Sequence, residues 1–280
     1  AFPTFVFIVY CRKLFPQMSG DTDTLLQIRH LGFAYGKRQL WANVDFDVPA
    51  GSVTAILGNN GTGKSTLLNC IGGILQPDTG SVFLNGEDLL KLPRRERARR
   101  VGYVAQHFET SGASVYDTVL LGRLPYFYSG PSPEDHEAVE RVLHDLGIAS
   151  WADRSAKTLS GGEAQKVMLA RAIVQQTDVL LLDEPTASLD LGNQVETLAY
   201  VSRYARERGT IVLMVSHDIN AALRFCSRFV LIDPQGFVTS VGADELTEGH
   251  LNRTYGIEIR LCEVEGQRLV LVENGSSFEC

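Results

Sequence analysis

Residues 53–71 read VTAILGNNGTGKSTLLNCI, and this stretch decides the fold. The apolar run from Val53 to Leu57 is typical of a buried strand, and it ends at Gly58. Residues 58–65 match the pattern G-x-x-x-x-G-K-[ST], in which backbone N–H groups and the start of the next helix surround an anion. The order strand, glycine-rich loop, helix therefore predicts a polyphosphate-binding loop.

Two side chains of this loop carry its chemistry. Lys64 would place a point charge on the β- and γ-phosphates, and the Ser65 hydroxyl would join the coordination shell of a magnesium ion. A purely structural glycine-rich turn would leave the lysine unexplained. We expect the whole loop to bind the cofactor, through Gly58, Asn59, Asn60, Gly61, Thr62, Gly63, Lys64, Ser65 and Thr66.

Two further apolar runs end in polar residues suited to the same site. Val179 to Leu182 is followed by Asp183 and Glu184, and Ile211 to Val215 is followed closely by His217. The carboxyl ends of parallel strands meet at one edge of a sheet, where ligands collect. Asp183 is the expected magnesium ligand, and Glu184 the base that orients and deprotonates an attacking water. We expect His217 to form a hydrogen bond with the γ-phosphate.

Composition is ordinary for a globular protein. The chain has 280 residues with 44% hydrophobic residues, and strands alternate with helical patterns, which predicts an α/β fold with a mostly parallel sheet. The net charge of −7 argues against a nucleic-acid partner. The basic run Arg94 to Arg100 is interpreted as a solvated helix face, because Glu96 interrupts it and no aromatic residue is interleaved. Five widely spaced cysteines without a C-x-x-C pair fit a reducing compartment.

The sequence LSGGE occupies residues 159–163, between the phosphate loop and VLLLDEP at 179–185. It resembles the signature of ATP-binding cassette (ABC) ATPases, and the order of motifs matches theirs over about residues 25–250. The resemblance implies the P-loop NTPase fold of ABC ATPases, in which a mostly parallel core sheet carries an antiparallel β-subdomain and a helical subdomain. It also implies ATP as substrate, Mg²⁺ as cofactor and ATP hydrolysis as the activity.

In that family two copies hold two ATP molecules head to tail. The resemblance implies that Ser160, Gly161 and Gly162 complete the site of the other copy, and that Ser188 to Asp190 crosses the interface. Glu163 stands where glutamine is commoner. Similarly, Asn59 replaces a frequent proline, without touching the glycine and lysine positions.

The same resemblance adds roles outside the central motifs. It implies that Tyr35 stacks on adenine and that Gln106 senses both the metal and the attacking water. The complete expectation assigns catalysis to Glu184, His217 and Gln106, metal binding to Ser65, Gln106 and Asp183, and further cofactor contacts to Tyr35, Ser160, Gly161, Gly162, Glu163 and Asp190.

The segment VYDTVLLGRLPY at 115–126 is similar to one in cassettes that serve iron-chelate (siderophore), haem and cobalamin importers. This implies docking to separate integral membrane permease subunits at the cytoplasmic face of the membrane, with an extracytoplasmic substrate-binding protein acting indirectly. A molybdate or tungstate importer ATPase is the alternative within this class. From a different class, a soluble cassette protein acting on ribosomes or DNA is the rival, although it usually has two fused cassettes or a long coiled-coil insertion.

The chain is expected to divide into an N-terminal extension, a main domain and an appendage. The apolar stretch Phe2 to Cys11 is shorter than the roughly 20 residues that a membrane-spanning helix needs. Residues 1–24 are expected to be poorly ordered. We expect residues 25–257 to form the ABC ATPase domain, with a helical subdomain at about 107–165, and residues 258–280 to form a short appendage.

Overall fold

The computed structural model describes residues 25–106 and 112–272. Its centre is a six-stranded sheet in the order β10-β9-β3-β8-β7-β6, in which only β10 runs antiparallel to its neighbour. The strands are β3 (Val53–Gly58), β6 (Val101–Val104), β7 (Val179–Asp183), β8 (Ile211–Val215), β9 (Arg228–Ile232) and β10 (Val238–Gly242). The predicted parallel core sheet is confirmed.

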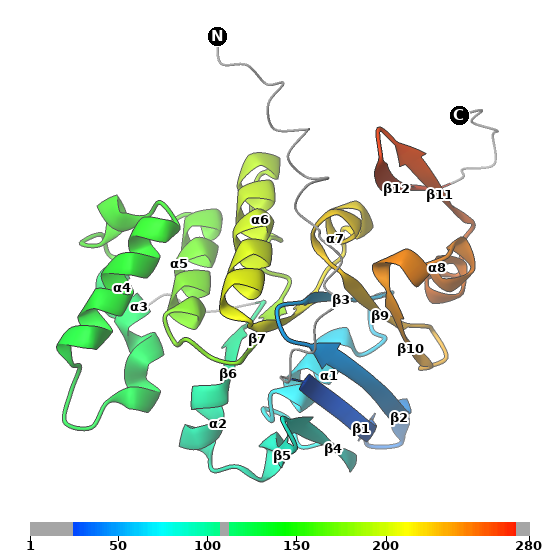
Figure 1. Cartoon of the computed structure of the whole chain (residues 1–280), viewed down its shortest axis with the longest axis horizontal. Coiled ribbons are helices and arrows are strands. Elements are labelled where there is room, and N and C mark those ends of the chain that lie inside the picture. The colour runs from blue at the N-terminus through cyan, green and yellow to red at the C-terminus, as the bar shows by residue number, and fades with distance from the viewer. Residues whose placement is uncertain (1–24, 107–111, 273–280) are drawn as a thin grey trace.

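A second, antiparallel sheet has the order β2-β1-β4-β5. It consists of β1 (Leu25–Tyr35), β2 (Arg38–Pro49), β4 (Thr79–Leu84) and β5 (Glu87–Asp88). Helix α1 (Lys64–Ile71) and this sheet share one apolar cluster with Ile56 of β3, on one face of the core sheet (Figure 1). The antiparallel β-subdomain therefore packs against the helix that begins at the phosphate loop.

Most of the remaining helices lie on the other face of the core sheet. Val53, Ala55 and Leu57 of β3 point into this second apolar cluster, which is the alternation that a strand produces. Figure 1 shows α5, α6 and α7 along this face, with α3 and α4 farther out. Their bounds are α3 (Val115–Leu120), α4 (Pro133–Asp145), α5 (Gly161–Ile173), α6 (Leu191–Arg208) and α7 (Ile219–Phe225).

One α-helix and two strands follow β10 in the described chain. Helix α8 (Glu248–Tyr255) leads to a hairpin of β11 (Ile259–Val264) and β12 (Gln267–Val272), where the appendage is expected. The expected boundary near residue 165 falls inside α5, which is continuous to Ile173. Residues 1–24 lie outside the described residues, as do 107–111 and 273–280. No helix in the described ranges is both long and apolar enough to cross a bilayer.

The basic run forms α2 (Arg94–Arg100), in which no residue is buried, as the interpretation as a solvated face requires; three of its arginines also bind backbone carbonyls. Arg95 and Arg99 each donate from Nε to the carbonyl oxygen of Pro125 at 3.0 Å. Arg97 donates to the carbonyl of Gly73 at 3.1 Å. Pro125 lies in the 3₁₀ helix Leu121–Tyr126, whose last carbonyls lack partners within the helix. The arginines therefore join α2 to the helical region.

The L-G-R-L-P segment contains a buried ion pair. Arg123 Nε lies 2.7 Å from Asp135 Oδ1, and the two side chains are only 11% and 5% exposed. Arg123 also donates to the carbonyl of Val174 at 3.1 Å. One guanidinium thus joins the 3₁₀ helix, the start of α4 and the end of α5.

We expect Asp135→Ala to lower the free energy of unfolding by about 3–5 kcal/mol, because it leaves the Arg123 charge buried without its partner. The matched control is Lys91→Ala, which removes the ammonium group of a lysine side chain that is 80% exposed from its pair with Asp88 and is expected to cost less than about 1 kcal/mol. Urea unfolding followed by circular dichroism measures both. Equal losses in the two variants would contradict the structural role of the buried pair.

Candidate functional site

The phosphate loop requires glycine at both of its ends. Gly58 ends β3 at φ 156°, and a Cβ there would lie 2.5 Å from the carbonyl oxygen of Ile232. Gly63 precedes α1 at φ 95°, and a Cβ there would lie 2.8 Å from Nε1 of Trp41. Both are positions that a side chain could occupy only with strain and displacement of its neighbours. The sequence pattern therefore follows from the path of the backbone.

Lys64 lies beneath this loop with its ammonium group held by backbone. Its Nζ donates to the carbonyls of Gly58 at 2.9 Å and Asn59 at 3.0 Å. The side chain is buried, and burial lowers the pKa of Lys64 because the charged form loses solvation. Asn59, where a proline is frequent in the family, donates from its side chain to the carbonyl of Tyr255 at 3.2 Å and so joins the loop to α8.

Ser65 and Asp183 come together from distant parts of the chain. Ser65 Oγ donates to Asp183 Oδ1 at 2.9 Å, and the Tyr103 hydroxyl donates to Asp183 Oδ2 at 3.4 Å. Burial raises the pKa of Asp183. A hydroxyl beside a buried carboxylate offers only oxygen donors, and these suit Mg²⁺.

Glu184 is the centre of the predicted catalytic group. Gln106 Nε2 donates to its Oε2 at 2.7 Å, and His217 Nε2 lies 2.5 Å from its Oε1. The backbone of Glu184 adopts φ 51°, in the left-handed region that residues other than glycine rarely occupy. The structure thus brings together the three residues expected to act in catalysis. His217, expected to contact phosphate, contacts Glu184 here.

Tyr35 ends the first strand with an accessible ring. Its side chain is 56% exposed, and the ring of Phe33 meets it edge-on at 4.9 Å. Three residues later, Arg38 Nη2 donates to the carbonyl of Gly61 in the phosphate loop at 3.3 Å. The turn that carries Tyr35 is therefore attached to the loop, which is consistent with an aromatic platform beside it.

The signature residues form the N-terminus of α5. Ser160 Oγ accepts from the backbone N–H of Glu163, and a Glu163 carboxylate oxygen accepts from that of Ser160 at 2.8 Å. Arg154 binds the same carboxylate from Nη1 at 2.7 Å. These bonds, with that of Arg154 the strongest, lower the pKa of Glu163 to about 2. Ser160 and Gly161 remain exposed at the start of the helix.

The signature and Asp190 are not part of the phosphate-loop cluster. In the part of the chain that the structure describes, no hydrogen bond or ion pair joins residues 160–163 or Asp190 to residues 58–66. Asp190 caps α6, where it accepts from the backbone N–H of Asn193 at 2.9 Å. The predicted site residues therefore form two separate groups within one copy.

Three residues of the site were not expected from the sequence. Tyr103 binds Asp183, Arg154 binds Glu163, and Gln165 binds the loop after Glu184. Tyr103 had a usable signal, because it lies near the carboxyl end of a core strand. Arg154 and Gln165 had none, since a basic or amide residue near a helix start is common.

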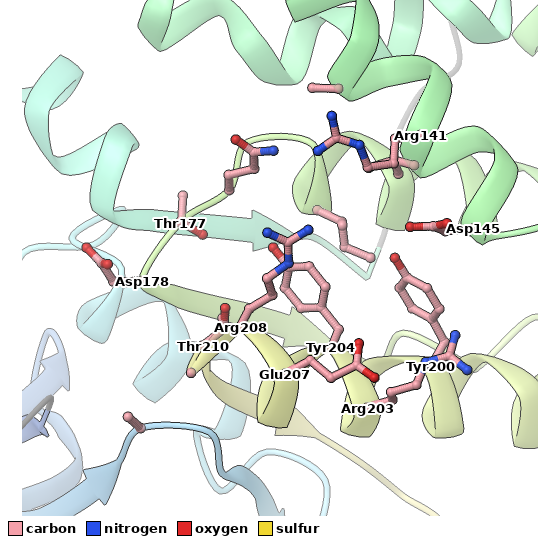
Figure 2. Close-up of a pocket in the computed structure, with 16 residues that line it drawn as sticks. Arg141, Asp145, Thr177, Asp178, Tyr200, Arg203, Tyr204, Glu207, Arg208 and Thr210 are labelled. Atoms are coloured by element: carbon pink, nitrogen blue, oxygen red, sulfur yellow. The ribbon is translucent and has the colours of Figure 1, made fainter. Parts of the chain in front are cut away.

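A cleft of about 720 Å³ lies elsewhere, between α4 and α6. Figure 2 shows Arg141 and Asp145 of α4 facing Tyr200, Tyr204 and Arg208 of α6. The lining mixes basic with acidic groups, so it does not select one charge of ligand, and it contains none of the predicted site residues.

The fold and the phosphate loop define the chain as a P-loop nucleoside-triphosphatase. A family model described as ABC transporter matches residues 41–187, which is more than half of the chain. The chain belongs to the ABC transporter family, as an ATP-binding subunit with ATPase activity.

Curated relatives and solved structures agree with this assignment. The chain is 38% identical to an uncharacterised ABC transporter ATP-binding protein of Methanocaldococcus jannaschii, over 88% of this chain and 97% of the relative. It is 36% identical to the ferric enterobactin transport ATP-binding protein FepC of Escherichia coli, over 89% and 95%. It is also 38% identical to the hemin import ATP-binding protein HmuV of Rhodococcus jostii, over 91% and 88%.

Two solved structures are similar in fold. A putative metal-chelate type ABC transporter in an inward-facing conformation superposes with a TM-score of 0.76 at 28% identity, over 88% of this chain and 96% of that one. A bacterial ABC transporter cassette solved as a dimer gives a TM-score of 0.70 at 26% identity, over 78% and 98%.

We expect Glu163→Gln to destabilise the chain in a pH-dependent way. The pKa of Glu163 in the folded chain, about 2, lies below its ordinary value of 4.5, so its carboxylate stabilises the fold above about pH 4.5. That contribution is lost as the pH falls toward 2. The difference in unfolding free energy between wild type and variant should therefore be largest at pH 7 and shrink at pH 3, measured by urea unfolding.

Glu137→Gln, at an exposed glutamate of α4, is the control and should give a small difference at both pH values. A Glu163→Gln effect that stays constant from pH 7 to pH 3 would contradict the charge-dependent cap.

Proposed function

We propose that the chain is the ATPase subunit of an importer for metal chelates of the iron-siderophore or haem class. It works as a head-to-tail dimer on separate permease subunits. The observation that carries the enzymatic part is the convergence of Gln106 and His217 on the Glu184 carboxylate, beside the Ser65–Asp183 pair. All of these residues follow or border the carboxyl ends of parallel strands, where ligands of such sheets bind.

Hydrolysis transfers the γ-phosphoryl group of ATP to water. The phosphates occupy the loop from Gly58 to Thr66, and Lys64 exchanges its carbonyl partners for phosphate oxygens. Glu184 accepts a proton from the water as its oxygen bonds to phosphorus, and ADP leaves with the electrons of the broken P–O bond. Gln106 and His217 hold the Glu184 carboxylate toward this water, and Tyr35 carries the adenine.

Ser65, Asp183 and Gln106 are the residues proposed to hold Mg²⁺. Their oxygen donors, including the buried Asp183 carboxylate, fit this hard cation. When bound, the ion neutralises negative charge on the phosphates. The Ser65 hydroxyl and the Asp183 carboxylate are already in contact, so two of the proposed ligands lie next to each other before the ion binds.

Dimerisation follows from the separation of the signature from the phosphate loop. Ser160 and Gly161 lie exposed at the N-terminus of α5, where free backbone N–H groups and the helix dipole favour an anion. In the proposed dimer these residues, with Gly162, Glu163 and Asp190, complete the nucleotide site of the other copy. A related bacterial cassette was solved as a dimer, which supports the dimeric state of the proposed assembly.

The transport role rests on relatives and on the L-G-R-L-P segment. Relatives are named for ferric enterobactin, iron(3+)-hydroxamate and hemin transport, and a similar structure is titled a metal-chelate type transporter. The helical region around Arg123 would receive the permease, which holds the chain at the cytoplasmic face of the membrane. An extracytoplasmic binding protein would deliver the chelate to that permease.

Affinity purification of the tagged chain from its native membranes tests the transport role. The expected result is a complex with a many-spanning permease which, reconstituted in vesicles, takes up a labelled ferric siderophore or haem only with ATP. Uptake of molybdate or tungstate instead, or of cobalamin alone, would replace the proposed cargo class. Recovery with ribosomes or DNA would overturn the transport role.

We expect Glu184→Gln to keep ATP binding but to lower turnover by at least about 10²-fold, because the water loses its positioned base. Since ATP persists between the copies, the variant should accumulate as a dimer with Mg²⁺ and ATP. Phosphate release and size-exclusion chromatography measure the two effects. Wild-type turnover in this variant would rule out Glu184 as the base.

Ser160→Arg should leave ATP binding to a single copy nearly intact and abolish hydrolysis. The added side chain obstructs the surface that meets the partner's nucleotide, and the loss of the cap bond to the N–H of Glu163 is expected to cost about 1 kcal/mol of stability, too little to unfold the chain. Calorimetry measures the binding, and the ATP-induced dimer of the Glu184→Gln chain should disappear when Ser160→Arg is added. A persisting dimer would argue against a shared site.

A further inference from the structure

Gln165 is a buried amide of α5 that serves neither motif in the proposed function. It lies one helical turn after Gly161, and its side chain is 3% exposed. Its Nε2 donates to the carbonyl of Glu184 at 2.7 Å, and its Oε1 accepts from the backbone N–H of Ser188 at 3.1 Å. Both ends of one side chain therefore hold the loop 184–188.

The bond to Glu184 acts on a strained residue. Glu184 has φ 51°, a conformation that residues other than glycine keep only where surrounding contacts fix it. The direction of its carbonyl and the direction of its side chain depend on the same backbone angles. Gln165, which binds the carbonyl, therefore helps to aim the carboxylate at Gln106 and His217.

Gly161 and Gly162 of the signature pack against the far end of this loop, at Ser188 and Leu189. A Cβ on Gly162 would lie 3.1 Å from the carbonyl oxygen of Ser188 and 3.2 Å from Cδ2 of Leu189. A Cβ on Gly161 would lie 3.6 Å from Cβ of Ser188. The start of α5 thus packs directly against the loop, without side chains between them, and a shift of one displaces the other.

The packing is looser elsewhere in the helical region than between α5 and the loop. Between α4 and α6 the helices are separated by the cleft of about 720 Å³ (Figure 2). A displacement of the N-terminus of α5 is therefore passed to residues 184–189, against which it packs without a gap.

We propose that Gln165 is a positioning residue that couples the two ATP sites of the dimer. This inference rests on the proposed function, in which the signature of one copy contacts the nucleotide of its partner. Contact at Ser160 fixes the start of α5, Gln165 then fixes the carbonyl of Glu184, and the base becomes aligned for the copy's own nucleotide. Nucleotide bound at one site thereby aligns Glu184 at the other site.

Gln165→Leu in the full-length chain, assembled with its permease, tests the coupling. It preserves approximate size and removes both hydrogen bonds. We expect kcat to fall about 10- to 100-fold, as is common when a catalytic group is misplaced. ATP affinity of the isolated copy should be unchanged, and the Hill coefficient for ATP should fall toward 1.

Gln194→Leu is the matched control. Gln194, on α6, donates from Nε2 to the carbonyls of Thr186 at 3.2 Å and Leu189 at 3.1 Å. It holds the same loop without touching Glu184 or the signature helix. We expect this variant to keep the wild-type Hill coefficient. Gln165→Glu, which keeps the acceptor for Ser188 but loses the donor to Glu184, is expected to behave like Gln165→Leu and decides the matter if the leucine variant does not fold.

Three outcomes would overturn the coupling. These are wild-type turnover in both Gln165 variants, a fall in kcat with the Hill coefficient unchanged, and equal effects in Gln165→Leu and Gln194→Leu. Failure of the proposed function is separate, because it would show as wild-type chain that neither hydrolyses ATP nor dimerises in the same assays.

Discussion

The register of the parallel strands is the constraint on which the site depends. β8 lies between β3 and β7, and Val215 is paired with Ile56 on one side and Asp183 on the other. This alignment brings the chain beyond each strand to the same edge of the sheet. Gly58 begins the phosphate loop there, and Glu184 and His217 meet there although they are 33 residues apart. A slip of one residue in β8 would exchange the side chains that fill the two apolar clusters on either face of the sheet, so close packing on both faces fixes the positions of the catalytic groups.

Two ionisable residues at this edge of the sheet, Lys64 and Asp183, are buried, and burial disfavours the charged form of each. Burial lowers the pKa of Lys64 and raises that of Asp183, so both charged forms are disfavoured by their surroundings. Each forms hydrogen bonds within the chain. Lys64 donates to the carbonyls of Gly58 and Asn59, and Asp183 accepts from the hydroxyl of Ser65. In the proposed function, phosphate oxygens offer the lysine stronger charge-assisted bonds than carbonyls do, and a cation does the same for the carboxylate. In the proposed function, binding therefore relieves the desolvation cost that folding imposes on Lys64 and Asp183.

The sequence was sufficient wherever a local pattern determines the structure. Apolar runs that end in Gly58 and Asp183 predicted the core strands and the site at their carboxyl ends, and the glycine positions follow from backbone space. The sequence was insufficient where a side chain binds a group that is distant along the chain. Arg95 binds a carbonyl 30 residues away and Gln165 one 19 residues away, and carbonyls carry no sequence signal. The carbonyl contacts of the exposed arginine run were missed for this reason, since charge patterning describes a helix face but not which backbone groups lie beside it.

One chain, in the proposed dimer, contributes to two nucleotide sites through elements that touch each other. The signature helix starts at Ser160, which serves the partner, and within about one turn it reaches Gln165, which binds the residue that serves the chain's own nucleotide. Because this connection consists of two hydrogen bonds and a close glycine contact, it has little freedom to absorb a displacement. Because both copies contain this connection, the coupling acts in both directions: the base of each copy is aligned by the nucleotide that the other copy binds. In the proposed dimer, hydrolysis at either site then becomes a property of the assembled pair and not of a single copy.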